Sequence, residues 1–406
     1  MGFQQGLSGL NAASRNLDVI GNNVANANTV GFKQSQTQFA DVFASSLSSS
    51  SGTQPGLGVQ VASVAQQFSQ GNVTASNNSL DIAINGSGFY RLSDQGTISY
   101  SRSGQFHPDK DGYIVNSNGQ RLTGYTANAA GQINAGTPGD LQISTADLPA
   151  HATSLVTTTA NLDSRDATLS PAAFDPADPT TYSSFAPIPV HDSLGNASTV
   201  STYFVKTAAN TWDVFAGSEG SLLNGGAPLG ALNFLSSGGL DPASSAMFNV
   251  TKPTSTGAAP VVFNLDFAGT TQFGSDFGIS KLSEDGYASG QLTGFNIGAD
   301  GIIHGSYSSG KTLNLGQVVL ANFANPQGLQ IQGNNTWTES ATSGVPLVGA
   351  PKTGGLGSLQ SNAVEDSNVE LTSELVNMIT AQRTYQANAQ TIKTQDQLLQ
   401  TIVNLR

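Results

Sequence analysis

The sequence predicts a mainly β protein with α-helical termini, in which nested β-rich domains are inserted between N- and C-terminal helices that pair in a coiled-coil-like inner domain. Apolar residues repeat every seven positions near both ends, as they do along a coiled-coil seam. Between the ends, Asn-Gly and Asp-Gly pairs separate short β-branched runs, which is typical of antiparallel sheets. The composition agrees, because only 10% of the 406 residues are charged, against roughly 25% in an average soluble protein.

The N-terminal repeat predicts a helix within residues 1–27. Its seven-residue series, with Leu7 on the same stripe, consists of Phe3, Leu10, Leu17 and Val24. The helix is expected to end before Thr29-Val30-Gly31, because the preceding asparagines and this glycine favour a stop.

The C-terminal repeat predicts a second helix that runs to the last residues of the sequence. Its stripe residues are Leu371, Leu375, Met378, Tyr385, Ile392 and Leu399. Ser367 and Glu370 have the spacing of a capping box, with Ser367 as N-cap and Glu370 at the third helical position. We expect the two stripes to pack against each other or against neighbouring copies. The alternative is that both helices pack on one globular core.

Turn dipeptides divide the region between the helices into short strands. The candidate hairpin turns are Asn85-Gly86, Asp111-Gly112, Asn118-Gly119, Asn224-Gly225, Asp285-Gly286 and Asp300-Gly301. Residues 45–51 have the composition of a low-complexity linker. The predicted domains are a helical inner core of residues 1–27 and 365–406, a bridging segment 28–70, a first β-domain of 71–145 and 285–364, and an outer β-domain 146–284.

One sequence fits a nucleotide-binding pattern but lacks its context. Residues 305–312, GSYSSGKT, match the P-loop pattern to the letter. That loop must follow a strand and open a helix, so that helix amides can hold phosphate. The residues that follow, 313–320, alternate and then become apolar, which predicts a strand. We therefore interpret Ser308-Ser309-Gly310 as a hairpin turn.

No other motif indicates catalysis, a cofactor or a metal. The histidines lie far apart, at His107, His151, His191 and His304, and no G-x-S-x-G or H-E-x-x-H pattern occurs. Asp109-Lys110-Asp111-Gly112 resembles the start of a calcium loop, but its glycine comes two positions early and Gln120 replaces the required glutamate. The absence of cysteine excludes disulfides and thiolate sites.

Charge and hydropathy exclude two classes of partner. The net charge is −12 with no cluster of lysine and arginine, which argues against nucleic-acid binding. No apolar run approaches the roughly 18 residues that a membrane span needs. The N-terminus also lacks the basic and apolar regions of a secretory signal. An exported chain would therefore leave by a route that reads something other than a cleaved signal.

Both ends of the sequence resemble a known family. Residues 7–33, from Leu7-Ser8-Gly9-Leu10 to Gly31-Phe32-Lys33, resemble the N-terminal signature of the flagellar rod and hook axial proteins. Residues 367–399 are similar to the other end of that family. The inner stretches 80–90, 100–106 and 315–329 also look like its shared β-domain, with 80–90 as the first strand pair. The large insertion, through 190–196, 203–206 and 212–214, resembles the outer domain of the hook members.

The resemblance implies a structural role without catalysis. It implies a subunit of a helical tube outside the cell that joins rod to filament, transmits torque while bending, and is exported through the flagellar type III route. The implied partners are further copies of the chain, a distal rod protein, a hook cap protein, a hook–filament junction protein and the flagellar export apparatus, with no nucleic acid, membrane insertion or cofactor. The implied assembly residues are the apolar residues of the two terminal stripes.

Two other functions fit parts of the pattern. A distal rod protein would have the same kind of terminal sequences, but the large central insertion argues against this function. A secreted carbohydrate-binding or adhesive β-protein would share the strand-rich middle, and glycan binding by that region would favour it.

Overall fold

The computed structural model describes residues 2–42, 58–144 and 146–404, and its architecture confirms the predicted fold class. A long helix stands near each end, α1 (Gly2–Ala25) and α2 (Leu371–Asn404), and short strands occupy the region between them. The predicted linker 45–51 lies outside the described residues. Contacts divide the chain into two compact units, the first of residues 1–144, 295–305 and 313–406 and the second of residues 145–294 and 306–312.

The first unit contains the two helices and several sheets. Its early strands are β1 (Ser35–Asp41), β2 (Val59–Gln66), β3 (Val73–Ala75), β4 (Ile82–Asn85), β5 (Phe89–Asp94), β6 (Thr97–Ser101), β7 (His107–Pro108), β8 (Ile114–Val115), β9 (Arg121–Thr126) and β10 (Gly139–Asp140). Its later strands are β23 (Thr312–Val318), β24 (Leu320–Asn322), β25 (Gln330–Gly333), β26 (Thr336–Thr338), β27 (Leu347–Gly349), β28 (Ser358–Ser361) and β29 (Ala363–Glu365). Strands β21 (Leu292–Ile297) and β22 (Ile302–Tyr307) carry the chain between the units.

Pairing in the first unit joins distant parts of the sequence. The main sheet has the strand order β21-β22-β23-β9-β5-β6-β26-β25. Two smaller pairs, β28 with β4 and β29 with β3, bring the segment before α2 against the segment that follows β2. Aromatic side chains fill the core of this unit, with edge-on contacts among Phe68, Phe89, Tyr100, Phe323 and Trp337.

The second unit is built from two five-stranded sheets that share one core. The first sheet contains β11 (Leu155–Asp163), β17 (Met247–Lys252), β18 (Val261–Asp266), β19 (Thr271–Phe273) and β20 (Gly278–Glu284). The second contains β12 (Ser184–His191), β13 (Ala197–Ala208), β14 (Thr211–Ser218), β15 (Ser221–Leu222) and β16 (Gly230–Asn233). Side chains of β12 alternate between buried and exposed, as they must when one face meets a core. Trp212 is fully buried in that core and donates a hydrogen bond from Nε1 to Gln272.

The turn predictions succeed where the flanking strands pair locally. Asp111-Gly112, Asn118-Gly119 and Asp300-Gly301 connect neighbouring strands, and each glycine has a positive φ. Three predictions are wrong. Asn224-Gly225 lies in a short 3-10 helix, and Asn85-Gly86 and Asp285-Gly286 connect strands that do not pair with each other. The predicted first strand pair of residues 80–90 fails likewise, because β4 pairs with β28 and β5 lies in the main sheet.

The candidate P-loop forms a hairpin. Strand β22 ends at Tyr307, β23 begins at Thr312, and Gly310 donates its amide to the Tyr307 carbonyl with a φ of +80°. The strand after the turn confirms that this sequence lacks the helix that phosphate binding requires.

The predicted capping box of α2 is wrong. The helix begins at Leu371, and the Glu370 carbonyl accepts a hydrogen bond from the Glu374 amide. Ser367 Oγ instead accepts from the Val369 amide in the turn before the helix. The side chain of Asn368 holds this turn in place through bonds to Gln34 and Gln67, so tertiary contacts delay the first helical turn.

Candidate functional site

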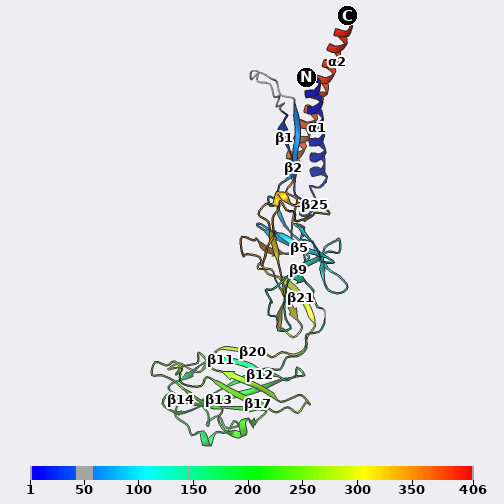
Figure 1. Cartoon of the computed structure of the whole chain (residues 1–406). Helices are drawn as coiled ribbons and strands as arrows, with labels where there is room; N and C mark the ends of the chain where they lie inside the picture. The colour runs from blue at the N-terminus through cyan, green and yellow to red at the C-terminus, as the bar shows by residue number, and fades with distance from the viewer. Residues whose placement is uncertain (1, 43–57, 145, 405–406) are drawn as a thin grey trace. The chain divides into compact units, whose positions relative to one another are not determined.

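Helices α1 and α2 lie side by side and antiparallel, as Figure 1 shows. Asn23 meets Glu374 at one end of the contact, and Gly2 meets Gln395 at the other. Between them, a Cβ on Gly9 would lie 2.8 Å from the side-chain amide of Asn388. A Cβ on Gly6 would lie 3.0 Å from Ile392. Small residues on α1 therefore bring the two helices close together.

Small and polar residues contribute more to the seam between the helices than the predicted apolar stripes do. The buried residues of α1 are Gly6, Ala12, Ala13, Ile20 and Asn23, and α2 buries Glu374 and Ala381. A signal for this seam was present, since Gly2, Gly9, Asn16 and Asn23 also recur every seven residues. The sequence did not predict this seam, because a seven-residue repeat is usually identified from its large apolar side chains.

The eleven predicted assembly residues remain partly or largely exposed within one chain. Ile392 contacts α1 at Gly6, and Leu10, Leu17, Val24 and Met378 are half-buried. The more exposed members range from Tyr385 at 37% to Leu399 at 54%, and include Phe3, Leu7, Leu371 and Leu375. Within one chain these two stripes do not pack into a common core, and their role in assembly stays a prediction.

A two-stranded ribbon lies against α1. Strands β1 and β2 pair antiparallel from Ser35 opposite Gln66 to Asp41 opposite Val59. Both strands contact α1, and Val59 donates its amide to Ser8 Oγ. The sequence predicts only a bridging segment at 28–70, because residues 35–41 lack a clear apolar alternation. The structure shows that the described part of this segment is largely this ribbon.

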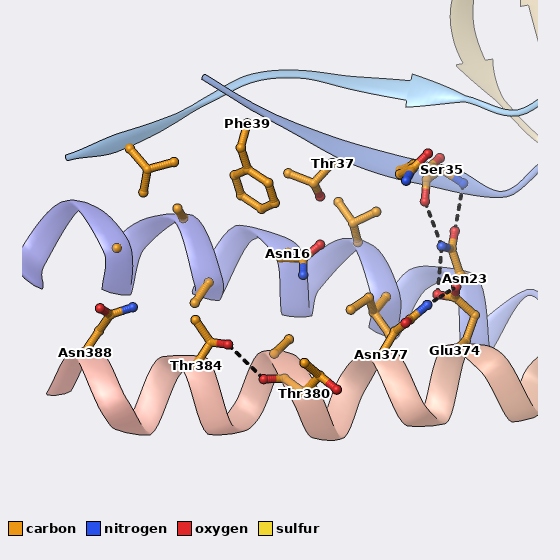
Figure 2. Close-up of a pocket in the computed structure, with 18 of the residues that line it drawn as sticks. Asn16, Asn23, Ser35, Thr37, Phe39, Glu374, Asn377, Thr380, Thr384 and Asn388 are labelled. Carbon is orange, nitrogen blue, oxygen red and sulfur yellow. Dashed lines mark hydrogen bonds between the residues drawn. The ribbon is translucent and has the colours of Figure 1, made fainter. Parts of the chain in front are cut away.

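A groove of about 880 Å³ opens where the ribbon meets the two helices. Figure 2 shows amide and hydroxyl side chains along it, with Phe39 pointing into it from β1. Among the described residues that line it, Glu374 is the one that carries a charge. The groove is therefore nearly uncharged, with hydrogen-bonding groups on both helices and on the ribbon.

A buried polar network closes one end of this groove. Asn23 and Glu374 are only 1% and 2% exposed. The Asn23 amide donates to the Ser35 carbonyl at 2.8 Å and to Glu374 at 3.1 Å, while its oxygen accepts from the Ser35 amide at 2.9 Å. Glu374 also accepts from Gln34 at 2.8 Å. Such a network fixes the register of α1, α2 and β1, because any shift would leave a buried polar atom without a hydrogen bond.

Next to this network, Glu365 is buried between two cations. Its carboxylate lies 2.7 Å from Lys33 Nζ and 2.6 Å from Arg102 Nε. Lys33 also donates to the Ser69 carbonyl, and Arg102 donates to the carbonyl of Gly86. Burial lowers the pKa of Lys33 from its ordinary value, whereas the charge and hydrogen bond of Glu365 oppose that change. The triad ties the segment after α1, the segment before α2 and the β-sheet region together.

Four family models match consecutive parts of the chain. They are the flagella basal body rod protein at residues 3–33, the flagellar hook protein FlgE/F/G D1 domain at 83–159, the flagellar basal body protein FlaE D2 domain at 161–287, and the flagellar basal body rod FlgEFG protein C-terminal region at 360–405.

Whole-chain relatives have the same kind of name. The chain is 42% identical to the flagellar hook protein FlgE of Escherichia coli K12 over 410 residues and 43% identical to that of Salmonella typhimurium over 413 residues, with 100% of both chains covered in each case. It is 33% identical to the Borreliella burgdorferi FlgE, covering 99% of this chain and 98% of the relative.

A solved structure supports the fold. The Helicobacter pylori flagellar hook protein FlgE2 matches with a TM-score of 0.55 and 14% identity, covering 72% of this chain and 100% of that structure.

Proposed function

The chain belongs to the flagellar hook protein family, and from that premise we propose that its copies form a flexible helical tube that joins rod to filament and transmits motor torque as a universal joint. It is a structural subunit of the flagellar hook and not an enzyme, and its place is the flagellum. Membership also implies self-polymerisation and contact with rod components.

The observation that carries this proposal is the full-length identity of 42–43% to hook proteins. The exposed apolar residues of α1 and α2 support it physically, because an isolated chain leaves them in water. Burying each large apolar side chain contributes about 1.5–3 kcal/mol. We propose that a tube buries them between copies, through Phe3, Leu7, Leu10, Leu17, Val24, Leu371, Leu375, Met378, Tyr385, Ile392 and Leu399.

The finer assignments of partners, route and domains belong to the same proposal. The tube would begin on the distal rod protein, grow beneath a hook cap protein and end at a hook–filament junction protein. Its subunits would pass through the flagellar export apparatus without a cleaved signal and assemble outside the cell. No helix in the described ranges is long and apolar enough to cross a membrane. Residues 1–27 and 365–406 would form the inner tube, 28–70 the bridge, 71–145 with 285–364 the first β-domain, and 146–284 the outer domain.

Electron microscopy of the purified chain tests the proposal. Concentrated protein is expected to form hollow tubes that bend along their length. Straight, rigid tubes would instead indicate a distal rod protein, and a chain that stays monomeric at every concentration and salt condition would contradict the proposed tube.

A further inference from the structure

We propose that His191 and Glu284 form a pH-dependent latch in the second unit, which holds the edge strand β20 against β12 when the imidazole is protonated and releases it when the imidazole is neutral. The latch acts within one chain, and it is therefore separate from the tube of the proposed function. Its two halves are buried polar atoms that face each other without a hydrogen bond.

Strand β20 is the part of the second unit that such a latch can hold or release. In the described structure it pairs with β11 alone, from Val156 opposite Glu284 to Asn161 opposite Gly278 (Figure 1). Six of its seven residues are exposed, and only Glu284 is half-buried. A strand with few buried contacts opens at a lower free energy than the rest of its domain. The attachment of β20 therefore depends on its ladder with β11 and on the contact that Glu284 makes.

Glu284 contacts His191, the last residue of β12 in the other sheet of the unit. Its Oε2 lies 3.8 Å from His191 Nδ1, which is too far for a hydrogen bond. Both atoms are shielded from solvent, and within the described residues neither has a hydrogen-bond partner. The residues opposite them on the paired strands, Val156 and Ala197, carry no charge. Buried polar atoms are normally paired, so this arrangement leaves two groups unsatisfied.

Protonation of His191 supplies what the carboxylate lacks. An imidazolium carries a proton on both ring nitrogens, so Nδ1 can donate to the carboxylate with the added attraction of opposite charges. Burial raises the pKa of Glu284 from its ordinary value, whereas the charges of His191 and Lys311 oppose that change and the charge of Asp285 adds to it. The Glu284 carboxylate is therefore poorly solvated and is stabilised by a positive charge beside it.

The acidic neighbours of the pair are already hydrogen-bonded elsewhere. Asp192 and Asp285 directly follow His191 and Glu284 in the chain. Each of their carboxylates accepts at least three hydrogen bonds, none of them from the pair. The imidazole of His191 is therefore left to Glu284 as its acidic partner.

The basic neighbours do not account for a change near neutral pH. Lys311, in the turn between β22 and β23, is the other cation whose charge acts on Glu284. Its Nζ lies 5.2 Å from the ring centroid of Tyr287, which stacks on His151. Imidazole is the side chain that changes charge between pH 5 and 8, so His191 and not Lys311 makes the contact pH-dependent.

The latch is closed only within a window of pH. As the pH rises through the range in which imidazole titrates, the positive charge is lost and β20 is released. As the pH falls through the range in which the carboxyl group titrates, the negative charge is lost with the same result. We expect the attachment of β20 to be strongest at about pH 5–6, between the ordinary titration ranges of the two groups.

Amide hydrogen exchange of the unassembled full-length chain tests the latch. Protection factors correct for the intrinsic pH dependence of exchange, and they are compared at about pH 5.5 and about pH 8, on the two sides of the range in which imidazole titrates. Wild-type β20 is expected to be about threefold more protected at the lower pH. Strand β17 belongs to the same sheet but does not contact the pair, and its protection should stay the same.

Two substitutions assign the change to the pair. His191→Gln and Glu284→Gln should each abolish the pH dependence of β20, because either one removes half of the latch. Both side chains are partly exposed, at 17% and 23%, so the variants are expected to fold. His151→Gln is the matched control and should keep the pH dependence.

Two results would overturn the latch. One is equal protection of wild-type β20 at the two pH values, which requires no substitution and so does not depend on the folding of a variant. The other is a pH difference that persists in His191→Gln or in Glu284→Gln. Neither result bears on the proposed tube, because the exchange is measured before the copies assemble.

Discussion

Glu365 is the residue at which three distant parts of the first unit meet. It balances Lys33 and Arg102 in a site where all three side chains are almost completely buried. A buried ion pair adds little net stability over an apolar replacement, but removal of one partner leaves an uncompensated charge. The triad is therefore stable only when all three residues are in place, because the loss of one leaves a buried charge without its partner.

Glu365→Gln is expected to destabilise the first unit by about 3–5 kcal/mol, because two buried cations lose their counter-charge. The free energy of unfolding can be measured in urea by fluorescence of Trp337, in a Trp212→Phe background that removes the signal of the second unit. The control is Asp94→Asn, an exposed carboxylate on β5. A loss no larger than that of the control would contradict the role of the triad.

Asp192 makes the second unit sensitive to acid. Burial alone would raise the pKa of its carboxyl, but hydrogen bonds from Asn196 and Thr256 hold the pKa at about 2, below its usual value of 3.8. A lowered pKa in the folded state stabilises the fold at pH values above the unfolded pKa. That stabilisation is lost as the pH falls through about 2.

Asp192→Asn is accordingly expected to lower the stability of the second unit at pH 7 by about 1–3 kcal/mol, because a buried charged acceptor is lost. The difference from wild type should shrink from pH 4 toward pH 2. Trp212 fluorescence in a Trp337→Phe background reports this unit. A difference that stays constant over that range would show that the carboxylate charge plays no part.

Buried polar residues were the part of the site that the sequence could not predict. Lys33, Arg102 and Glu365 lie far apart in the chain, and no spacing rule connects them. Asn23 and Glu374 fall on helices that were predicted, but their partners Gln34 and Ser35 lie in a segment read as a bridge. Long-range pairing of polar groups depends on the tertiary fold and leaves no local pattern.

At the scale of elements, the sequence predicted the helices better than their packing. The seven-residue series correctly placed α1 and α2, because amphipathic periodicity is a property of the helix itself. The series could not show which stripe faces the other helix within a chain. Glycines on α1 allow an approach that large side chains would prevent.

Gly6→Val tests this close approach. The added side chain would meet Ile392, since even its Cβ would lie 3.0 Å away. We expect the helix pair to lose about 1–3 kcal/mol through overpacking, seen as faster amide hydrogen exchange in α1. The control is Gly21→Ala, where no atom lies within 4 Å of the new Cβ and helix propensity predicts slower exchange. Equal effects of both substitutions would contradict the glycine seam.

Strand prediction failed where pairing was not local. Hairpins such as β7–β8 followed from turn dipeptides, whereas β4 pairs with β28 across more than 270 residues of sequence. A turn sequence specifies only the bend, and the partner of each strand is chosen by the whole sheet.

At the scale of the whole molecule, the sequence predicted the fold class and the family because family-like motifs occur at both ends and in the β-rich middle, where family models also match. The terminal helices keep large apolar residues in water within a single chain, which only an assembly can relieve. The contacts within one chain do not show how these residues pair between copies, so this pairing stays a prediction.

Leu399→Asp tests the role of the exposed stripe. Because Leu399 is more than half exposed, the folded chain should retain its circular dichroism spectrum and its unfolding transitions. Assembly should be abolished, because a tube would have to bury an unpaired carboxylate. Normal motility of cells that carry only this variant would disprove the assembly role of Leu399.

Electron microscopy of basal bodies from cells that lack this gene tests whether the chain is the subunit of the hook. We expect complete rods that end where the hook should begin, with hooks restored by the wild-type gene. Truncated rods would instead assign the protein to the rod, and unchanged flagella would contradict its assignment to the hook.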